Sequence, residues 1–568
     1  MKKTTPAFLK RFFEAGYSEP SPWPARIFLC LAVLISYAGV WSNEFVFDDR
    51  NLIINNSFLR HWGSLFRLLT STSTAGLGVA HDGFYRPVPM LIYFFIYQAF
   101  GLSTIVFHAL NVALQALNAC LLHRFGIRAG FSKGAVFAAA LLWAVHPLHT
   151  SDVSYISATP ELLWSAFCLL GLITLLPDFT PHKIGKSLIF FVLALGCKES
   201  AVVFPALAVA TLFFVNKDRL RLSTYLKTWP LWLISALYIS AWILFMHETG
   251  YSMDKTGNAE FFQGYTSNLT NRILTCLATL PVYAQLIIWP EGLHVERDFP
   301  FFSTLLPYPA AGALMAVLGF LQVLRVLLRR NKHTSEAGRR LALSFGIFWF
   351  AAAFSPYTSI VFPIDERIAE GWMYMPTMGL FLGVAQTCAG FFEKRKNAVR
   401  LLVLALAFSL GVTTFFQNET WRNSETLYQN TLQNGGYIYR LSYHAGLFNL
   451  EHHDFDEAAG QFQDLIDHSD GRSALWSANV HMLLAAAWLQ PDLDANDVIT
   501  VDAVMRALPS STHISEAIAE YGRALQDSPD LYWAHKYLAV IYRYQGNNQM
   551  ADFHQKRVDA ILKIQGGP

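Results

Sequence analysis

The sequence predicts an all-α, polytopic membrane protein with a soluble helical domain at its carboxyl end. Hydrophobic residues make up 53% of the chain and charged residues only 15%, where an average soluble protein has about 25% charged residues. Apolar runs of spanning or nearly spanning length recur as far as Phe416, and the composition beyond it is that of a soluble helical domain. We therefore expect a multi-pass membrane domain at residues 1–416 and a soluble domain at residues 417–568.

The first apolar run, residues 25–41, is expected to be an uncleaved signal anchor. Lys2, Lys3, Lys10 and Arg11 precede it, and no small-residue cleavage site follows it. Since lysine and arginine are retained on the cytoplasmic side of a membrane, the amino terminus is predicted to be cytoplasmic. The formal net charge of +2 does not indicate a nucleic-acid partner. The six cysteines have no ligand-like spacing, so neither a disulfide framework nor a zinc site is expected.

Further apolar runs bring the expected number of crossings to roughly eleven. Basic loops between them are assigned to the cytoplasm by their lysine and arginine content, namely residues 123–133, 183–186, 216–227, 328–340 and 393–400. This alternation is consistent only if the apolar stretches 88–100 and 271–290 are re-entrant or interfacial helices that do not cross. The expected spans after the first are residues 104–122, 134–148, 161–177, 186–197, 200–216, 229–246, 308–328, 342–355, 371–391 and 399–416.

The loops with most of the unusual polar residues then face the non-cytoplasmic side. They are residues 43–87, 146–160, 247–270, 291–307 and 356–370. A functional site and the carboxyl-terminal domain are therefore expected on the periplasmic side of a bacterial inner membrane, or on the lumenal side of the endoplasmic reticulum membrane if the source is eukaryotic.

An acidic pair, Asp48 and Asp49, follows the first span directly. Carboxylates at the water-facing end of a span stay hydrated and ionised, so they can take a proton or bind a cationic or hydroxyl-bearing substrate. The alternative is that the two residues only mark where the helix leaves the bilayer.

A second group of polar residues lies in the loop after residue 145. Pro147 ends a helix there, so His149, Asp152 and Glu161 are expected to be exposed at the membrane surface, near Asp48. The spacing His-x-x-His-x-x-Asp could bind a divalent metal. Because the proline breaks helical facing, the metal is not favoured, and we assign no metal ligands.

Basic residues at the same face are candidates for binding phosphate. Arg86 is expected at the headgroup level, where its planar fork suits a phosphate, although contact with a lipid phosphate is the alternative. Lys198 and Glu199 lie between two apolar runs. An ionisable residue inside a span costs about 2.5 to 3.5 kcal/mol, so they are expected to be paired or to line a cavity. A mutual ion pair without a further role is the competing interpretation.

The last polar cluster contains Glu366, Arg367 and Glu370. An arginine flanked by carboxylates can hold a lipid-linked phosphate while the carboxylates orient it. Ordinary solvation of a loop would explain the same composition.

The soluble domain carries a repeat signal. Small and aromatic residues with a following proline have the spacing of the second helix of a tetratricopeptide repeat, and small residues recur 34 positions later. The segment from about residue 490 to 511 is interpreted as an insertion between repeats. Stacked helical hairpins commonly form a groove that holds peptide, and the alternative is that they only cap the membrane domain. The repeat residues are Ala517, Tyr521, Ala524 and Pro529, then Ala551 and Val558, with an earlier copy at Ala445, Gly446, Ala458 and Phe462.

The order of these motifs resembles the transmembrane and tetratricopeptide-repeat O-mannosyltransferases and their bacterial relatives. The shared motifs are Asp-Asp after the first span, Tyr-Arg-Pro, Phe-His-x-x-Asn, His-Pro-x-His-Thr, Cys-Lys-Glu and Ala-Glu-x-x-x-Tyr-x-Pro, followed by helical repeats. That family belongs to the polytopic GT-C glycosyltransferases, which use polyprenyl-phosphate sugars. The resemblance covers nearly the whole chain.

The resemblance implies roles for particular residues. It makes Asp48 or Asp49 the catalytic carboxylate, and it places six residues around the donor: Arg86, His149, Asp152, Lys198, Glu199 and Glu370. Two of the motifs depart from the family pattern. Ser151-Asp152 stands where the family has Thr-Glu, and Gly371 stands where an arginine often follows the glutamate. A phosphate contact is therefore either missing or supplied by Arg367.

The resulting hypothesis is an inverting glycosyltransferase without a certain cofactor. It would move a sugar from a polyprenyl-phosphate donor to a hydroxyl, most plainly of protein serine or threonine, on the non-cytoplasmic face, with the acceptor held by the repeat domain. Alternatives are a transferase for oligosaccharide or for cell-envelope polysaccharide or lipid, and a non-enzymatic scaffold that recruits partners through the repeats. A transporter is disfavoured because its charged residues should concentrate near the bilayer midplane.

Overall fold

The computed structural model describes residues 23–77, 84–176, 179–215, 225–248, 268–328, 335–361, 364, 366–390, 395–436, 439–467, 474–490 and 500–565. The basic amino-terminal residues, most of the loops at 216–227 and 247–270, and part of the loop at 328–340 lie outside these ranges. Within the described ranges the regular elements are helices, which confirms the predicted all-α class.

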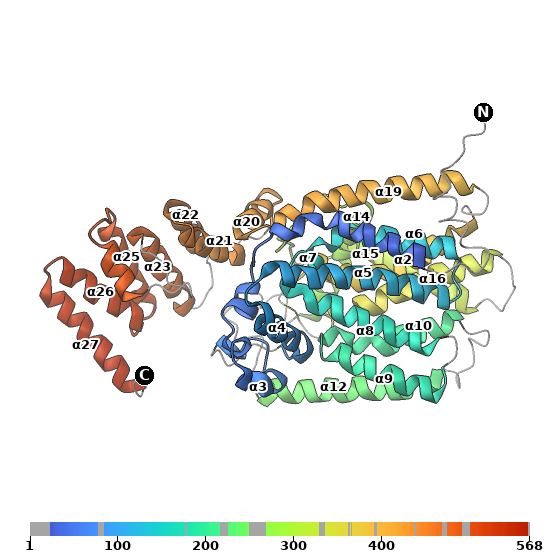
Figure 1. Ribbon diagram of the computed structural model, residues 1–568, viewed down its shortest axis with the longest axis horizontal. Coiled ribbons are helices and arrows are strands. Elements are labelled where there is room, and N and C mark those ends of the chain that lie inside the picture. The colour runs from blue at the N-terminus through green and yellow to red at the C-terminus, as the bar shows by residue number, and fades with distance from the viewer. Residues whose placement is uncertain are drawn as a thin grey trace. The chain divides into compact units, whose positions relative to one another are not determined.

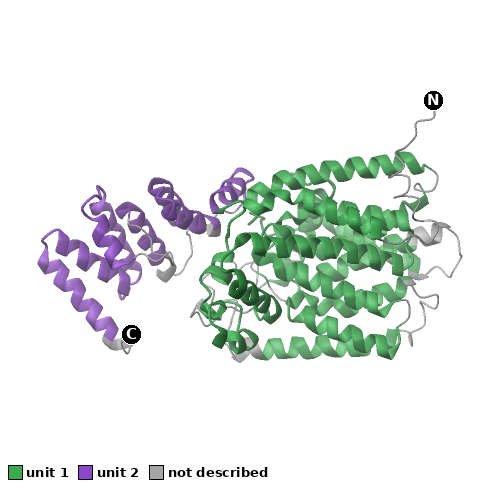
Figure 2. Cartoon of the chain, viewed as in Figure 1, with its two compact units in different colours: residues 1–251, 268–423 green, residues 252–267, 424–568 purple. Residues whose placement is uncertain are grey.

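The chain divides into two compact units (Figure 2). The first consists of Met1–Tyr251 and Asn268–Asn423, and the second of Ser424–Pro568 together with residues 252–267, which are not described. The first unit contains the apolar helices of membrane-spanning length and every candidate residue of the membrane domain. The second contains the helices of the soluble part.

Long helices of the first unit run side by side (Figure 1), and the charged loops lie at their ends. Short helices α3 and α7 belong to those loops. The helices are α2 (Trp23–Ser36), α3 (Leu65–Thr70), α4 (Pro87–Phe100), α5 (Thr104–Arg128), α6 (Lys133–Ala144), α7 (Thr150–Val153), α8 (Thr159–Leu175), α9 (Pro181–Leu195), α10 (Phe204–Val215), α12 (Trp229–Glu248), α14 (Leu269–Ile288), α15 (Pro307–Leu328), α16 (Ser335–Phe354), α17 (Tyr374–Thr387) and α19 (Lys396–Gln417).

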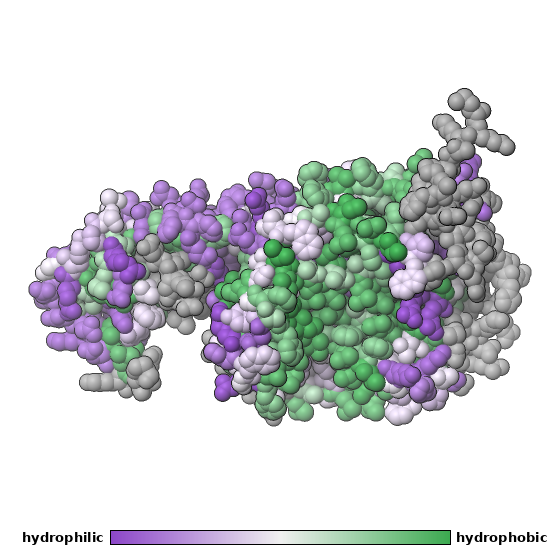
Figure 3. All heavy atoms as spheres, viewed as in Figure 1, coloured by the Kyte–Doolittle hydropathy of each residue, from purple (hydrophilic) through white to green (hydrophobic). Residues whose placement is uncertain are grey.

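Five described helical segments are long and apolar enough to cross a membrane. Apolar residues dominate the face of this unit that Figure 3 shows, as expected for a surface in contact with lipid. Most of the other expected spans are shorter apolar helices, so the number of crossings stays a prediction. The five segments are Thr104–Arg128, Ile156–Leu175, Leu269–Ile288, Pro307–Val326 and Lys396–Trp421.

Helix α14 differs from the sequence expectation in its length. The stretch 271–290 was expected to be re-entrant or interfacial, but α14 is continuous over 20 residues around Pro281 and long enough to cross. In its first turn, Arg272 Nη1 donates a 2.9 Å hydrogen bond to the Ser359 carbonyl. At its other end, the Ile287 carbonyl lies 2.9 Å from His146 Nε2. Both ends therefore contact loops assigned to the outer side, and the interfacial placement stays a prediction.

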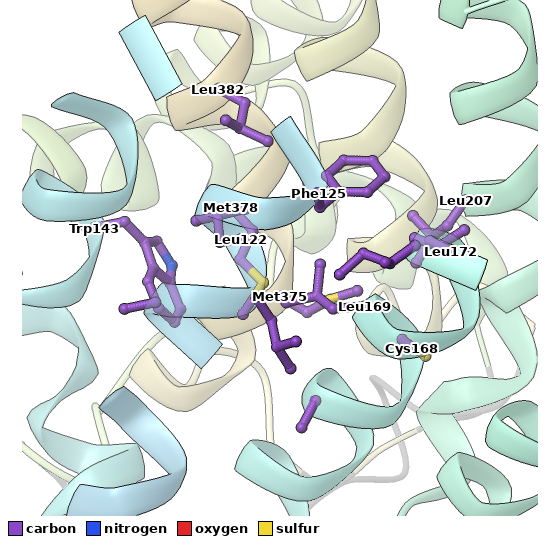
Figure 4. Packing of buried hydrophobic residues seen from close by; sticks show 14 of the residues in the cluster. Leu122, Phe125, Trp143, Cys168, Leu169, Leu172, Leu207, Met375, Met378 and Leu382 are labelled. Carbon is purple, nitrogen blue, oxygen red and sulfur yellow. The ribbon is translucent and has the colours of Figure 1, made fainter. Parts of the chain in front are cut away.

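The core of the first unit is built where α5, α6, α8, α10 and α17 pack together (Figure 4). Bulky apolar side chains from these helices meet in one buried cluster that includes Phe125 and Trp143. Helices α16 and α17 approach closely because Gly379 faces Trp349, and a Cβ at Gly379 would lie only 2.1 Å from the indole. A small residue at such a contact lets a side chain of one membrane helix pack directly against the backbone of the other.

The second unit contains the helical hairpins of the repeat domain. The repeat residues predicted from spacing are buried, apart from the exposed Pro529, and a Cβ at Gly446 would lie 2.5 Å from the Phe462 ring. Helix α21 pairs with α22, and α26 pairs with α27. The helices are α20 (Ser424–Gln433), α21 (Tyr439–Glu451), α22 (Phe455–Asp467), α23 (Ala474–Leu489), α24 (Val501–Ala507), α25 (Ile514–Asp527), α26 (Tyr532–Tyr544) and α27 (Asn548–Gln565).

The insertion at about 490–511 lies inside a hairpin, and its expected place between two repeats is wrong. Helix α23 packs against α25, with Ala485 and Leu489 in the same core cluster as Ala517 and Tyr521. The physical reason is that the second-helix pattern of α25 needs a first-helix partner. The apolar face of α23 supplies it from before the insertion.

Candidate functional site

Asp49 ties the first outer loop to the next one. Its side chain is buried, and its Oδ2 accepts a 3.0 Å hydrogen bond from the Val46 amide. Its Oδ1 accepts a 2.7 Å hydrogen bond from the Ser157 amide and a second from the Ser157 hydroxyl. Since both oxygens are engaged, Asp49 braces the loops that carry its neighbours.

Asp48 has a different environment from Asp49. It is partly exposed, and its amide donates a 3.1 Å hydrogen bond to the Tyr155 hydroxyl. Phe47, just before it, has a φ of 54°, a left-handed conformation that disfavours a residue with a Cβ. The ring of Tyr155 stacks on Trp421 with centroids 5.2 Å apart. The strained turn thus holds two adjacent carboxylates in unlike surroundings, with Asp48 the more accessible.

Burial makes the carboxyl group of Asp49 a weaker acid than usual. Loss of hydration raises its pKa from 3.8 to about 7, although the hydrogen bonds from Ser157 and Val46 act in the opposite direction. Asp48 contributes a smaller repulsion that also raises the pKa. Asp49 therefore titrates near neutrality in the folded protein.

This pKa predicts a pH dependence of stability that Asp49→Asn should remove. Between about pH 4 and pH 7 the unfolded chain has lost this proton while the folded chain retains it, so stability falls as pH rises through that window. We expect thermal unfolding of the purified chain in detergent to show a smaller decline over this window in the variant. An equal decline in both proteins would show that Asp49 does not titrate there.

Glu161 and Lys198 form a buried ion pair at the end of the helical bundle. Glu161 lies in the first turn of α8, where Trp164 Nε1 donates to its Oε1 at 2.8 Å. Lys198 Nζ bonds the other oxygen, and the Tyr357 hydroxyl donates to it at 3.4 Å. Burial is the largest single effect and lowers the pKa of Lys198, but Glu161, together with Tyr357 and Glu199, raises the pKa of the ammonium overall.

Arg86 and Glu199 form the neighbouring pair. Arg86 Nε and Nη2 donate to the two carboxylate oxygens of Glu199 at 3.1 and 2.8 Å. The guanidinium also lies 4.3 Å from the centre of the Phe84 ring. Lys198 and Glu199 were expected to be paired or to line a cavity, with a mutual ion pair as the competing interpretation. The mutual pair is wrong, because each has a partner from another segment of the chain.

His149 and Asp152 lie side by side without a hydrogen bond between them. Both, like Glu161, are buried, so the expected exposure of these three residues is wrong; the helices packed around the loop cover them. His149 Nδ1 is 3.9 Å from Asp152 Oδ2, which is too long for one. His149 packs between Trp143 and Tyr374, with ring centroids 5.0 and 5.2 Å apart. Burial, and then the neighbouring His146, lower the pKa of His149 well below its usual value. The imidazole is therefore neutral at physiological pH.

Asp152 lies close enough to Glu161, Lys198 and Glu370 for their charges to act on it. Burial raises its pKa well above the usual value, Glu161 and Glu370 raise it further, and Lys198 lowers it. A Cβ at Gly371 would lie 2.8 Å from Asp152 Oδ1. Gly371 is thus a close approach that brings Asp152 beside the segment carrying Glu370. A longer residue there would displace the carboxylate.

Glu370 is paired with Arg297, a residue that the sequence patterns did not single out. Arg297 Nη2 donates to Glu370 Oε1 at 2.6 Å, and the His294 amide donates to the same oxygen at 2.8 Å. Burial raises the pKa of Glu370 and Arg297 lowers it in part. The only sequence signal for Arg297 was its place in the outer loop 291–307. Its partner Glu370 is 73 positions away, and a contact over that separation produces no local sequence pattern.

The remaining candidates lie in the loop before Glu370. Glu366 is exposed and Arg367 is partly buried. The cation that pairs with Glu370 is Arg297, and the phosphate contact assigned conditionally to Arg367 stays a prediction. Among the described residues there is no group of three or more histidine, cysteine, aspartate or glutamate side chains that could hold a metal ion.

Comparison with known proteins shows what the chain is similar to. It is 23% identical over 410 residues to a protein O-mannosyl-transferase of Caenorhabditis elegans, 25% over 441 residues to protein O-mannosyl-transferase TMTC3 of Mus musculus, and 23% over 474 residues to TMTC4 of Homo sapiens. These alignments cover 70%, 71% and 72% of this chain and 56%, 47% and 62% of the relatives. The chain thus spans about half to three fifths of the length of these relatives. No family model and no solved structure matches it.

Proposed function

Because this chain is homologous to the TMTC-family protein O-mannosyl-transferases, we propose that it is a multi-pass membrane glycosyltransferase that acts on proteins. Its donor is a polyprenyl-phosphate sugar, and its acceptor is a serine or threonine hydroxyl on the non-cytoplasmic face of the membrane. The repeat domain holds the acceptor polypeptide.

One observation carries the proposal beyond homology. Three cations, Arg86, Lys198 and Arg297, are each held by a carboxylate in the first unit, and Asp152 is influenced by two of these pairs. Cations fixed in this way can stabilise a leaving phosphate without rearranging during the reaction. A scaffold or a lipid anchor has no need of three ion pairs that are partly or largely buried, which cost desolvation free energy.

The proposed reaction is a direct displacement. The acceptor oxygen attacks the anomeric carbon, the bond from that carbon to the phosphate oxygen breaks, and the polyprenyl phosphate leaves with the electron pair. Asp48 takes the proton of the acceptor hydroxyl, because it is more accessible than Asp49. Asp49 is a positioning residue that holds the loop through Ser157. Inversion at the anomeric carbon follows from a single displacement.

The test is transfer in membranes that contain the chain. They are supplied with radiolabelled polyprenyl-phosphate mannose and with secreted proteins from the same source, and label in protein is read on a gel. We expect label that β-elimination releases, as for a sugar on serine or threonine, and no label from a nucleotide sugar alone. Label in lipid or polysaccharide would favour the envelope transferase, and no label in any acceptor would favour the scaffold.

A further inference from the structure

A cleft lies where α14 ends and α15 begins. Its volume is about 330 Å³, and apolar side chains form most of its wall. The polar and charged side chains that line it are those of Gln285, Glu291, Arg297 and Tyr308, the last through its hydroxyl. The apolar lining residues are Val282, Leu286, Phe299, Pro300 and Phe302.

Arg297 is partly committed and partly available in this cleft. Its Nη2 bonds Glu370 and the Gly292 carbonyl, at 2.6 and 2.7 Å. Its Nε is buried and makes no hydrogen bond to any described residue. An orphaned N–H on a guanidinium is costly, and an anion entering the cleft would satisfy it. A phosphate is suited to this because its oxygens accept charge-assisted hydrogen bonds from guanidinium N–H groups.

The surroundings of the cleft are those of a lipid-facing surface. Only 11% of the spanning window of α15, Pro307–Val326, is buried inside the protein. Large apolar residues beside the cleft are exposed, including Trp289, Leu305 and Tyr308, which are 66%, 66% and 56% exposed. A ligand whose phosphate reaches Arg297 can therefore keep an isoprenoid tail against α14 and α15, outside the protein.

We propose that this cleft is the site where the phosphate of the lipid-linked donor binds, with Arg297 as its principal cation. The inference rests on the proposed function and adds a residue and a location to it. Glu370 holds Arg297 in place and competes with the phosphate for its N–H groups. Gln285 and Glu291 offer hydrogen bonds to the hydroxyls of the sugar.

The competition predicts opposite effects for the two members of the ion pair. Arg297→Gln should weaken binding of a polyprenyl phosphate about 10- to 100-fold, the range for a lost charged hydrogen bond. Glu370→Gln should strengthen it several-fold, because the guanidinium is freed from its carboxylate. A pair with only a structural role would give no gain in the second variant. Arg297→Lys, which keeps the charge but not the planar fork, should recover part of the affinity.

The experiment uses the full chain in nanodiscs, titrated with sugar-free polyprenyl phosphate and read by native mass spectrometry. Polyprenol, phosphatidic acid and inorganic phosphate are the comparison ligands. Arg325→Gln is the matched control, because Arg325 is exposed on α15 and does not line the cleft. We expect polyprenyl phosphate to bind most tightly and to depend on Arg297. Equal binding of polyprenol or phosphatidic acid, or equal effects of the Arg297 and Arg325 variants, would overturn the inference.

Transfer kinetics separate this inference from the proposed function. If the chain transfers sugar, Arg297→Gln should raise the KM for the donor more than it lowers kcat. If Arg297→Gln transfers sugar with an unchanged KM for the donor, the cleft is not the donor site, while the proposed glycosyltransferase activity still holds. If the chain transfers no sugar but binds polyprenyl phosphate in a way that depends on Arg297, the cleft is a lipid-phosphate site and the proposed reaction is wrong.

Discussion

Replacing Asp48 with asparagine should lower the rate of sugar transfer about 10²- to 10⁴-fold, the contribution of a positioned general base. The amide keeps the shape of the side chain but cannot take the acceptor proton. Asparagine keeps the backbone amide that donates to the Tyr155 hydroxyl, so this contact should persist in the variant. The measurement is initial transfer rate per amount of folded protein in membranes supplied with the lipid-linked donor.

Two controls make the Asp48 result specific. Glu44→Gln changes an exposed carboxylate in the same loop and should leave transfer unchanged. Asp49→Asn should disturb the bonds to Ser157 and lower both transfer and thermal stability. If Asp48→Asn transfers at the normal rate, Asp48 is not the base, and if Asp49→Asn also does so, the mechanism is removed.

Replacing Lys198 with methionine should destabilise the first unit by about 3 to 5 kcal/mol, the cost of leaving one member of a buried ion pair alone. Glu161 is only 3% exposed and would keep an uncompensated charge. Its remaining partners, Trp164 and Tyr357, donate neutral hydrogen bonds that replace little of the lost attraction. Thermal unfolding in detergent, read as loss of the monodisperse peak on gel filtration, measures the effect.

A double variant separates stability from function. Lys198→Met with Glu161→Gln removes both charges, so stability should return most of the way to that of the unmodified chain. Transfer should stay low, because a cation beside the leaving phosphate is still missing. Recovery of transfer together with stability would show that the pair has only a structural role.

Local sequence patterns predicted much of the fold. The all-α class followed from apolar runs such as 104–122, which lies within the single helix α5, and from composition. The second-helix pattern of Ala517, Tyr521 and Ala524 correctly marked buried positions of a repeat helix. The place of the insertion was missed, since spacing within one helix does not say which earlier helix packs against it.

The candidate site was predicted less completely. Asp48, Asp49, Arg86, Lys198 and Glu370 were all chosen for charge beside an apolar run, and each lies in or beside the loops of the first unit. Their partners were not predicted. Lys198 and Glu199 are adjacent in sequence, yet their side chains bond residues 37 and 113 positions away.

The sequence alone determined that the bundle is built of apolar helices, where charged loops separate its spans, and that the carboxyl-terminal part contains repeats. These features depend on hydrophobicity and periodicity over neighbouring residues. Tertiary structure alone decided which carboxylate holds which cation, that Asp49 is a brace while Asp48 stays accessible, and that Arg297 stands beside Glu370. The reason is that electrostatic attraction and burial act between groups close in space, and helix packing sets those distances across tens to hundreds of residues.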